Sequence, residues 1–210
     1  MKTSLLLKKL RMEEKEFVTS KELKRYCKSM KLSYEMVIRY FASRGHLVRI
    51  FRGIFYIKSL DEAKLGKTKY SHLELVARGL ELKNVKNWYF GLYTALKLNN
   101  MTHEHFAIDY VASDKVFRAK PMNIAGYKFK FIKLASPLLE FGITKDRLRY
   151  SDVEKTILDF IYMWRYNGIP KDKIVLDVAE WAKDISKDKI KEYAKRYPKT
   201  IQKIVEEVVR

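Results

Sequence analysis

Cysteine and long hydrophobic runs are what this chain most clearly lacks. Its 210 residues include one cysteine, Cys27, so no internal disulfide can form. The position of Cys27 in an apolar helical pattern predicts a small buried side chain in a reducing compartment. The run from Leu5 to Leu7 is too short for a signal peptide, and no apolar segment is long enough to cross a bilayer. We therefore expect a soluble, cytoplasmic protein.

The common signatures of catalytic and metal sites are also missing. The sequence has no Gly-rich phosphate loop, no nucleophile elbow, no cysteine pairs with zinc spacing and no glycine-serine segment followed by paired aspartates. His103 and His105 have a spacing found in metal sites, but no further ligand is near them in sequence. Asp152 and Glu154 stand at an expected helix start, where capping and the helix dipole already explain acidic residues, and Asp159 follows on the same helix. We therefore expect no enzymatic activity, no metal and no cofactor.

Acidic residues are scarce relative to basic ones. The chain has 44 Lys and Arg against 25 Asp and Glu, a net charge of +19. Residues 1–60 contain 15 of the basic residues and 5 acidic ones, a net of +10, while residues 61–210 carry the other +9. A segment so basic is expected to bind a polyanion such as DNA with strong salt dependence. Glutamine is nearly absent, with only Gln202, a bias typical of heat-adapted proteins.

Residues 17–44 have the pattern of two consecutive helices. Thr19 and Glu22 have the spacing of a capping box, which predicts a helix that begins at Ser20. After a short turn, Ser33 is a strong N-cap residue for a second helix that extends to residue 44.

A basic hairpin is expected directly after these helices. Gly45 stands where a left-handed residue would end the second helix. Residues 47–51 and 54–57 then read as two strands joined by a turn at Arg52 and Gly53. Two helices followed by such a hairpin predict a winged helix-turn-helix, the main reason to expect sequence-specific DNA binding.

The second helix has two different faces. Tyr34, Val37, Ile38 and Phe41 share an apolar stripe and are the expected core face. The opposite face would enter the major groove, while hairpin arginines would reach phosphates or the minor groove. Some of these residues also have plainer interpretations: Met36 and Tyr40 could pack against a neighbouring domain, and Arg49 could be a solvated strand residue. The residues expected to contact DNA are Ser33, Glu35, Met36, Arg39, Tyr40, Ser43, Arg49 and Arg52.

The remainder of the chain reads as a second, mixed α/β domain. We place the boundary in the polar segment 59–70, which gives a winged helix-turn-helix domain at 1–60 and an α/β domain with a helical tail at 61–210. The overall fold class is therefore α+β. The elements expected in the second domain are helices at 71–82 and 87–100, strands at 106–112, 127–131 and 148–151, a helix opened by a Ser151–Glu154 capping box, and tail helices restarting at Ser186 and Pro198.

Three strings in this order resemble the AbiE-type antitoxins, which are also described as predicted transcriptional regulators of viral defence systems. They are LVRIFRGIFYI at 47–57, NWYFGLYTALKL at 87–98 and SDVEKTILDFIY at 151–162. With the helices before them, they span most of residues 17–165. The residues that match the family's pattern are Arg49, Arg52, Gly53 and Tyr56 in the hairpin, Gly91, Tyr93, Thr94, Ala95 and Leu96 in the second string, and Glu154, Thr156, Leu158 and Asp159 in the third.

The resemblance implies a DNA-binding autorepressor. Its winged helix would bind inverted repeats in its own promoter through the hairpin arginines, and its second domain would counteract a nucleotidyltransferase-like toxin encoded beside it in a type IV toxin-antitoxin system. The matched residues of the second domain look architectural, and the tail after residue 170 carries no signature. Two alternatives remain: a stand-alone regulator whose second domain senses a ligand or mediates assembly, and a protein-interaction module with a basic surface.

Overall fold

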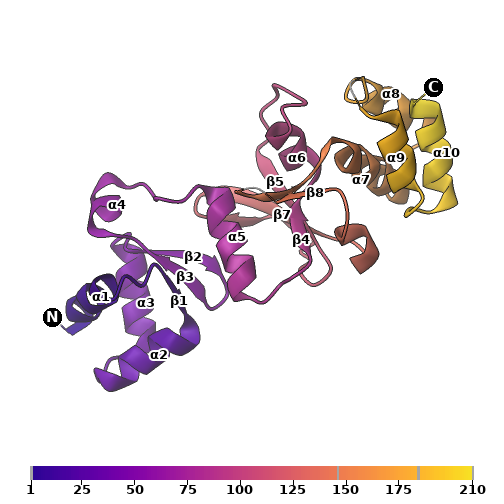
Figure 1. The fold of residues 1–210 in the computed structure, drawn as a ribbon. Helices are drawn as coiled ribbons and strands as arrows, with labels where there is room; N and C mark the ends of the chain where they lie inside the picture. Colours follow the sequence, from indigo (N-terminus) through magenta and orange to yellow (C-terminus); the bar gives the residue numbers. More distant parts are fainter. Residues whose placement is uncertain (1, 146, 184, 210) are drawn as a thin grey trace. The chain divides into compact units, whose positions relative to one another are not determined.

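A computed structural model describes residues 2–145, 147–183 and 185–209 of the chain. The chain divides into two compact units. The first comprises residues 1–84 with 123–126, and the second comprises residues 85–122 and 127–210. The fold is α+β, as the sequence predicted: helices with a small sheet come first, followed by a mixed six-stranded sheet and a helical end (Figure 1).

The first unit has the element order of a winged helix. Its three-stranded antiparallel sheet has the order β1-β3-β2. The two predicted helices and the predicted hairpin are confirmed at their expected places. The elements are α1 (Lys2–Met12), β1 (Phe17–Thr19), α2 (Ser20–Ser29), α3 (Tyr34–Ser43), β2 (Leu47–Phe51), β3 (Ile54–Ile57), α4 (Leu60–Leu65) and α5 (His72–Leu82).

Local hydrogen bonds explain where α2 and α3 begin. The backbone N–H of Glu22 donates to Thr19 Oγ1 at 3.2 Å, and the Thr19 N–H donates to Glu22 Oε2 at 2.9 Å, which completes the predicted capping box. Ser33 Oγ accepts from the N–H of Met36 at 3.4 Å. Gly45, with φ of +66°, adopts the left-handed conformation just after α3.

Three elements of this unit were not expected from the sequence: α1, β1 and α4. Helix α1 buries Leu6, Leu7 and Leu10 in a core that also contains Val37 and Phe41 of α3. Strand β1 pairs with β3 and gives the hairpin a third strand. Helix α1 was missed because its buried leucines alternate with a run of basic residues, which lowers the mean hydropathy of the segment.

The boundary between the two units lies further along the chain than the expected position in 59–70. Helix α5 belongs with the first unit because it packs on β2 and β3. The contact is close at Gly79, where a Cβ atom would lie 2.6 Å from Ile50 Cγ2 and 2.8 Å from the Phe51 ring. The expected hinge is itself folded: Tyr56 donates to Glu62 of α4 at 2.5 Å.

The second unit contains most of a sheet of order β6-β7-β5-β4-β9-β8, whose strand β6 is divided between the two units. Pairing is parallel for β5 with β7 and for β4 with β9, and antiparallel for β4 with β5 and for β8 with β9. Helices α7 to α10 pack on one another. The elements are β4 (Trp88–Phe90), α6 (Leu92–Leu98), β5 (Ile108–Ser113), β6 (Met122–Ile124), β7 (Tyr127–Lys133), η1 (Ser136–Leu139), β8 (Ile143–Lys145), β9 (Arg149–Ser151), α7 (Val153–Tyr166), α8 (Lys171–Ala179), α9 (Lys187–Ala194) and α10 (Lys199–Val208).

Two details of the sequence prediction are wrong in this unit. The helix expected at 87–100 is a central strand, β4, followed by the shorter helix α6, because Trp88–Phe90 is buried as a strand between β5 and β9. The expected Ser151–Glu154 capping box does not form. Asp152 is the N-cap and accepts from the N–H of Lys155 at 2.9 Å, while the Ser151 hydroxyl bonds to Thr156 Oγ1 at 2.7 Å.

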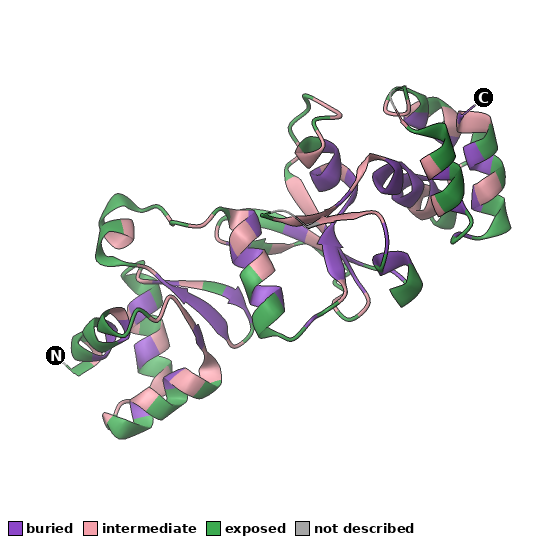
Figure 2. Ribbon diagram, viewed as in Figure 1, coloured by how far each residue is buried: buried purple, intermediate pink, exposed green. Residues whose placement is uncertain are grey.

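Helix α7 is the buried centre of the second unit. Every residue from Glu154 to Ile161 is buried, so neighbouring elements cover this stretch on all sides (Figure 2). The tail helices contribute Ile174, Ile190 and Ile204 to the same core. Among the described residues, no helix combines the length and apolarity needed to cross a membrane.

Candidate nucleic-acid interface

An open groove of about 860 Å³ lies between α3 and the β2–β3 hairpin of the first unit. One wall comes from α3, the other from the hairpin, and the start of α2 closes one end. The residues that line it are Ser20, Lys24, Tyr34, Glu35, Ile38, Arg39, Ala42, Leu47, Arg49, Arg52, Gly53 and Phe55.

The groove is positively charged. It is lined by Lys24, Arg39, Arg49 and Arg52, and by a single acidic residue, Glu35. All four cationic side chains are exposed. Within the described ranges, no hydrogen bond or ion pair occupies the guanidinium groups of Arg39, Arg49 or Arg52. These three arginines are thus free to donate bidentate hydrogen bonds to a planar anion or to a guanine edge.

The hairpin tip is fixed against α2. The Ser20 N–H donates to the carbonyl of Gly53 at 2.8 Å, and Gly53 has φ of +79°. A Cβ atom at this glycine would lie 3.0 Å from Ser20 Oγ, which already bonds to the Tyr34 hydroxyl at 2.9 Å. The hairpin, α2 and α3 therefore hold the backbone next to Arg52 in a defined position relative to α3.

The structure brings only some of the predicted contact residues into the groove. Glu35, Arg39, Arg49 and Arg52 line it. Ser33 caps α3, with its hydroxyl donating to Glu35 Oε2 at 3.2 Å.

The remaining predicted residues lie elsewhere on α3. Met36 and Ser43 are exposed but do not border the groove. Tyr40 is half-buried and faces α1, with the Arg44 guanidinium 5.6 Å from its ring centre.

Lys24 was not predicted as a groove residue, and Ile38 lies at the edge of the core rather than wholly inside it. Lys24 lies on α2, with its Nζ 5.2 Å from the centre of the Tyr34 ring, and it borders the groove. Ile38 packs against the core as expected, but it is only half-buried and also lines the groove. Helical periodicity shows on which face of the helix a residue lies. Which residues of that face line the groove depends on the docking of the hairpin on α2, and this contact is not visible in the local sequence.

The second unit contains a buried polar cluster that the sequence did not reveal. Lys155 Nζ donates to the hydroxyls of Tyr89 and Tyr197, at 2.8 Å each, and to Asp159 Oδ1. Tyr89 and Tyr197 in turn donate to the Asp159 carboxylate at 2.6 and 2.7 Å. Burial, and then the charge of Asp159, raise the pKa of both tyrosines well above the usual value. The cluster joins β4, α7 and the turn between α9 and α10, and all its members are buried, which makes it a structural centre.

No cluster of potential metal ligands occurs among the described residues. His103 and His105 are both exposed, in the segment between α6 and β5. Asp152 and Glu154, which were expected at a helix start, both form ion pairs with Lys189, at 3.1 and 2.8 Å.

Comparison with known proteins gives a structural likeness and no sequence relative. No family model matches the chain, and no curated protein matches it by sequence. The crystal structure of the Rv2827c protein from Mycobacterium tuberculosis is similar, with a TM-score of 0.62 and 14% sequence identity. The match covers 99% of this chain and 76% of that chain, which shows a shared fold.

Proposed function

We propose that this protein binds double-stranded DNA through its first unit and represses its own promoter. The observation that carries the proposal is the convergence of Arg39, Arg49 and Arg52, unpaired within the described residues, on one groove beside α3. In a winged helix-turn-helix, the second helix enters the major groove and the wing contacts the flanking backbone. Arg39 is placed on α3 to reach base edges, while Arg49 and Arg52 are placed on the wing to reach phosphates.

The charge distribution supports this proposal. Residues 1–60 hold more than half of the net charge in less than a third of the chain. A surface of this kind binds any duplex through counterion release, and that binding weakens steeply with salt. Discrimination between sequences must then come from base contacts made by α3.

The test is fluorescence anisotropy of the full chain on the duplex upstream of its own gene and on a shuffled duplex, each over a salt series. We expect the upstream duplex to bind at least about 10³-fold more tightly, as is usual for specific DNA-binding proteins. Equal binding to both duplexes, abolished by salt, would overturn sequence-specific repression and leave a basic interaction module.

We further propose that the second unit serves the antitoxin function implied by the resemblance to AbiE-type antitoxins, against a nucleotidyltransferase-like toxin. The alternative is a stand-alone regulator whose second unit senses a ligand or mediates assembly. Co-expression of the full chain with the product of the neighbouring gene separates the two. Rescue of growth by an Arg39→Ala/Arg49→Ala/Arg52→Ala variant that no longer binds DNA would favour the antitoxin, and failure of the wild-type chain to rescue would favour the regulator.

A further inference from the structure

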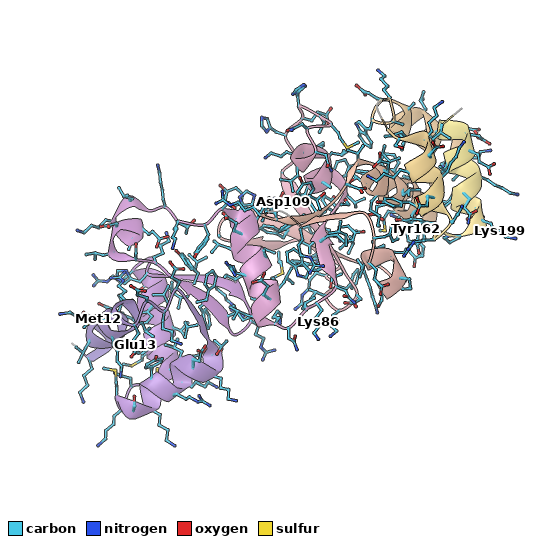
Figure 3. The ribbon with its side chains drawn as sticks, viewed as in Figure 1. Met12, Glu13, Lys86, Asp109, Tyr162 and Lys199 are labelled. Carbon is cyan, nitrogen blue, oxygen red and sulfur yellow. The ribbon has the colours of Figure 1, made fainter. Side chains whose placement is uncertain are left out.

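A second cationic pocket lies on the other side of α3 from the groove. It has a volume of about 540 Å³ and is formed by α1, the end of α3 and the residues around β2 and β3. Met12, at the end of α1, borders it and is labelled in Figure 3. The residues that line the pocket are Ser4, Leu7, Lys8, Arg11, Met12, Tyr40, His46 and Leu60, with no acidic side chain among them.

Arg11 is held rigidly at this pocket. Its Nε donates to the carbonyl of Lys58 at 3.0 Å, and its Nη2 donates to the carbonyl of Ser59 at 3.2 Å and lies 3.4 Å from His46 Nδ1. In the described part of the chain, Nη1 has no hydrogen-bond partner. The guanidinium is thus oriented in advance and keeps donors for an anion.

Lys8 adds a second unpaired cation. The next residue, Lys9, forms an ion pair with Glu13 at 3.9 Å, whereas Lys8 has no such partner in the ranges that the structure describes. Arg44 stands beside the pocket with its guanidinium over the Tyr40 ring. Burial, and then the positive charges of Arg11 and Arg44, lower the pKa of His46. Both guanidinium groups are therefore close enough to the His46 ring to act on its charge.

We propose that this pocket binds a single phosphate group, through Lys8, Arg11 and Arg44. Three cationic donors without a lining carboxylate match a phosphate, and the Ser4 and Tyr40 hydroxyls add neutral donors. A free phosphate ion and a phosphate of the DNA backbone offer the same chemistry.

The position of the pocket favours the DNA backbone, an argument that rests on the proposed function. Successive residues of an α-helix are about 100° apart. The groove therefore lies on the side of Glu35, Ile38 and Ala42, and the pocket lies on the side of Tyr40. A helix in the major groove has a phosphate backbone on each side, so the wing would contact one strand and the pocket the other.

The test uses two double variants of the full chain. Lys8→Gln/Arg44→Gln removes one exposed cation that lines the pocket and one that stands beside it, and Lys97→Gln/Lys203→Gln removes two exposed cations from the second unit as the control. Arg11 is left in place because its hydrogen bonds support Lys58 and Ser59. Thermal melting followed by circular dichroism checks that both variants are folded.

Two measurements decide the outcome. The first is the slope of log K against log salt for an arbitrary duplex, and the second is an NMR titration of the His46 ring with sodium phosphate against sodium chloride at equal ionic strength. A slope lowered by about one per lost phosphate contact in the pocket variant but not in the control identifies a backbone phosphate. An unchanged slope with a phosphate-specific His46 shift, lost in the pocket variant, identifies free phosphate.

The proposal of a phosphate site is overturned if the pocket variant leaves the salt slope unchanged and phosphate causes no specific shift of the His46 ring in the wild-type chain. If the wild-type chain binds no duplex, the proposed function fails, but the phosphate titration still decides on the pocket. The two proposals can therefore fail independently.

Discussion

Lys155 and Asp159 lie one turn apart on α7 and form an ion pair whose side chains are only 0% and 1% exposed. The two phenolic hydroxyls of Tyr89 and Tyr197 complete the hydrogen bonding of this pair. A buried ion pair is costly to break from one side, because the remaining charge stays in the protein without a partner.

Lys155→Met should therefore destabilise the protein by about 3–5 kcal/mol. Urea denaturation of the full chain measures this loss. The matched control is Lys173→Met, which breaks the Lys173–Asp177 ion pair on α8. This pair has the same i,i+4 spacing but is accessible to solvent, so its loss should cost less than about 1 kcal/mol. Equal losses for the two variants would show that the buried cluster has no special structural role.

This cluster also shows where prediction from sequence ends. The apolar stripe of the helix that begins at residue 153 was predictable from the spacing of Ile157, Phe160 and Ile161. Lys155 was not, because its partners Tyr89 and Tyr197 are 66 and 42 residues away in the chain. A local pattern indicates which residues share a face of an element, but not which distant element covers that face.

The same distinction holds in the first unit. Capping and turn residues such as Thr19, Ser33 and Gly53 act locally, so α2, α3 and the hairpin were predictable almost to the residue. The groove depends on the docking of the hairpin tip on α2, and the extent of the unit depends on the packing of α5 on β2. Both are non-local contacts, so Lys24 and the end of the unit near residue 84 were not predicted.

The hydrogen bond from Tyr56 to Glu62 should make stability depend on pH at both extremes. Burial raises the pKa of Glu62, but hydrogen bonds from Tyr56, Lys69 and Ser59 outweigh it and lower the pKa overall. The contribution of Glu62 to the free energy of unfolding is therefore present above the pKa that this group has in the unfolded state. It is lost as the pH falls through the pKa that the group has in the folded state. Burial and this hydrogen bond raise the pKa of Tyr56, so its contribution is present below pH 10 and is lost at higher pH.

Tyr56→Phe should remove about 1–2 kcal/mol at pH 7, reduced from the usual value for a charged acceptor because Glu62 is partly exposed. The loss should shrink toward pH 3 and above pH 10. Unfolding in urea at a series of pH values measures it, with Tyr166→Phe as an exposed control that should change stability by less than about 0.5 kcal/mol. A loss that does not vary with pH would rule out the hydrogen bond as its source.

Gly79 of α5 has no room for even a small side chain. A Cβ atom there would meet Ile50 Cγ2 at 2.6 Å and the Phe51 ring at 2.8 Å, so α5 would have to move away from β2. Gly79→Ala should destabilise the protein by about 1–3 kcal/mol despite the better helix propensity of alanine. The neighbouring exposed Arg78→Ala is the control for urea denaturation, and a stabilised Gly79→Ala variant would show that α5 does not pack closely on β2.

Replacing Arg39 with alanine and replacing Arg52 with alanine should change DNA binding in different ways. Arg39 lies on α3 and Arg52 at the hairpin tip, on opposite walls of one groove. Loss of a base contact should cost about 1–3 kcal/mol on the preferred site and much less on a shuffled duplex. Loss of a phosphate contact should weaken both duplexes alike and lower the salt slope by about one.

Anisotropy titrations of both variants on both duplexes, at several salt concentrations, distinguish these effects. Arg165→Ala, an exposed arginine in the last turn of α7, controls for the loss of one positive charge elsewhere. If Arg39→Ala weakens every duplex equally, α3 contacts the backbone and specificity must arise elsewhere. If Arg52→Ala instead changes the preference between the two duplexes, the hairpin contacts bases in the minor groove. The hairpin, and not α3, would then provide the sequence specificity.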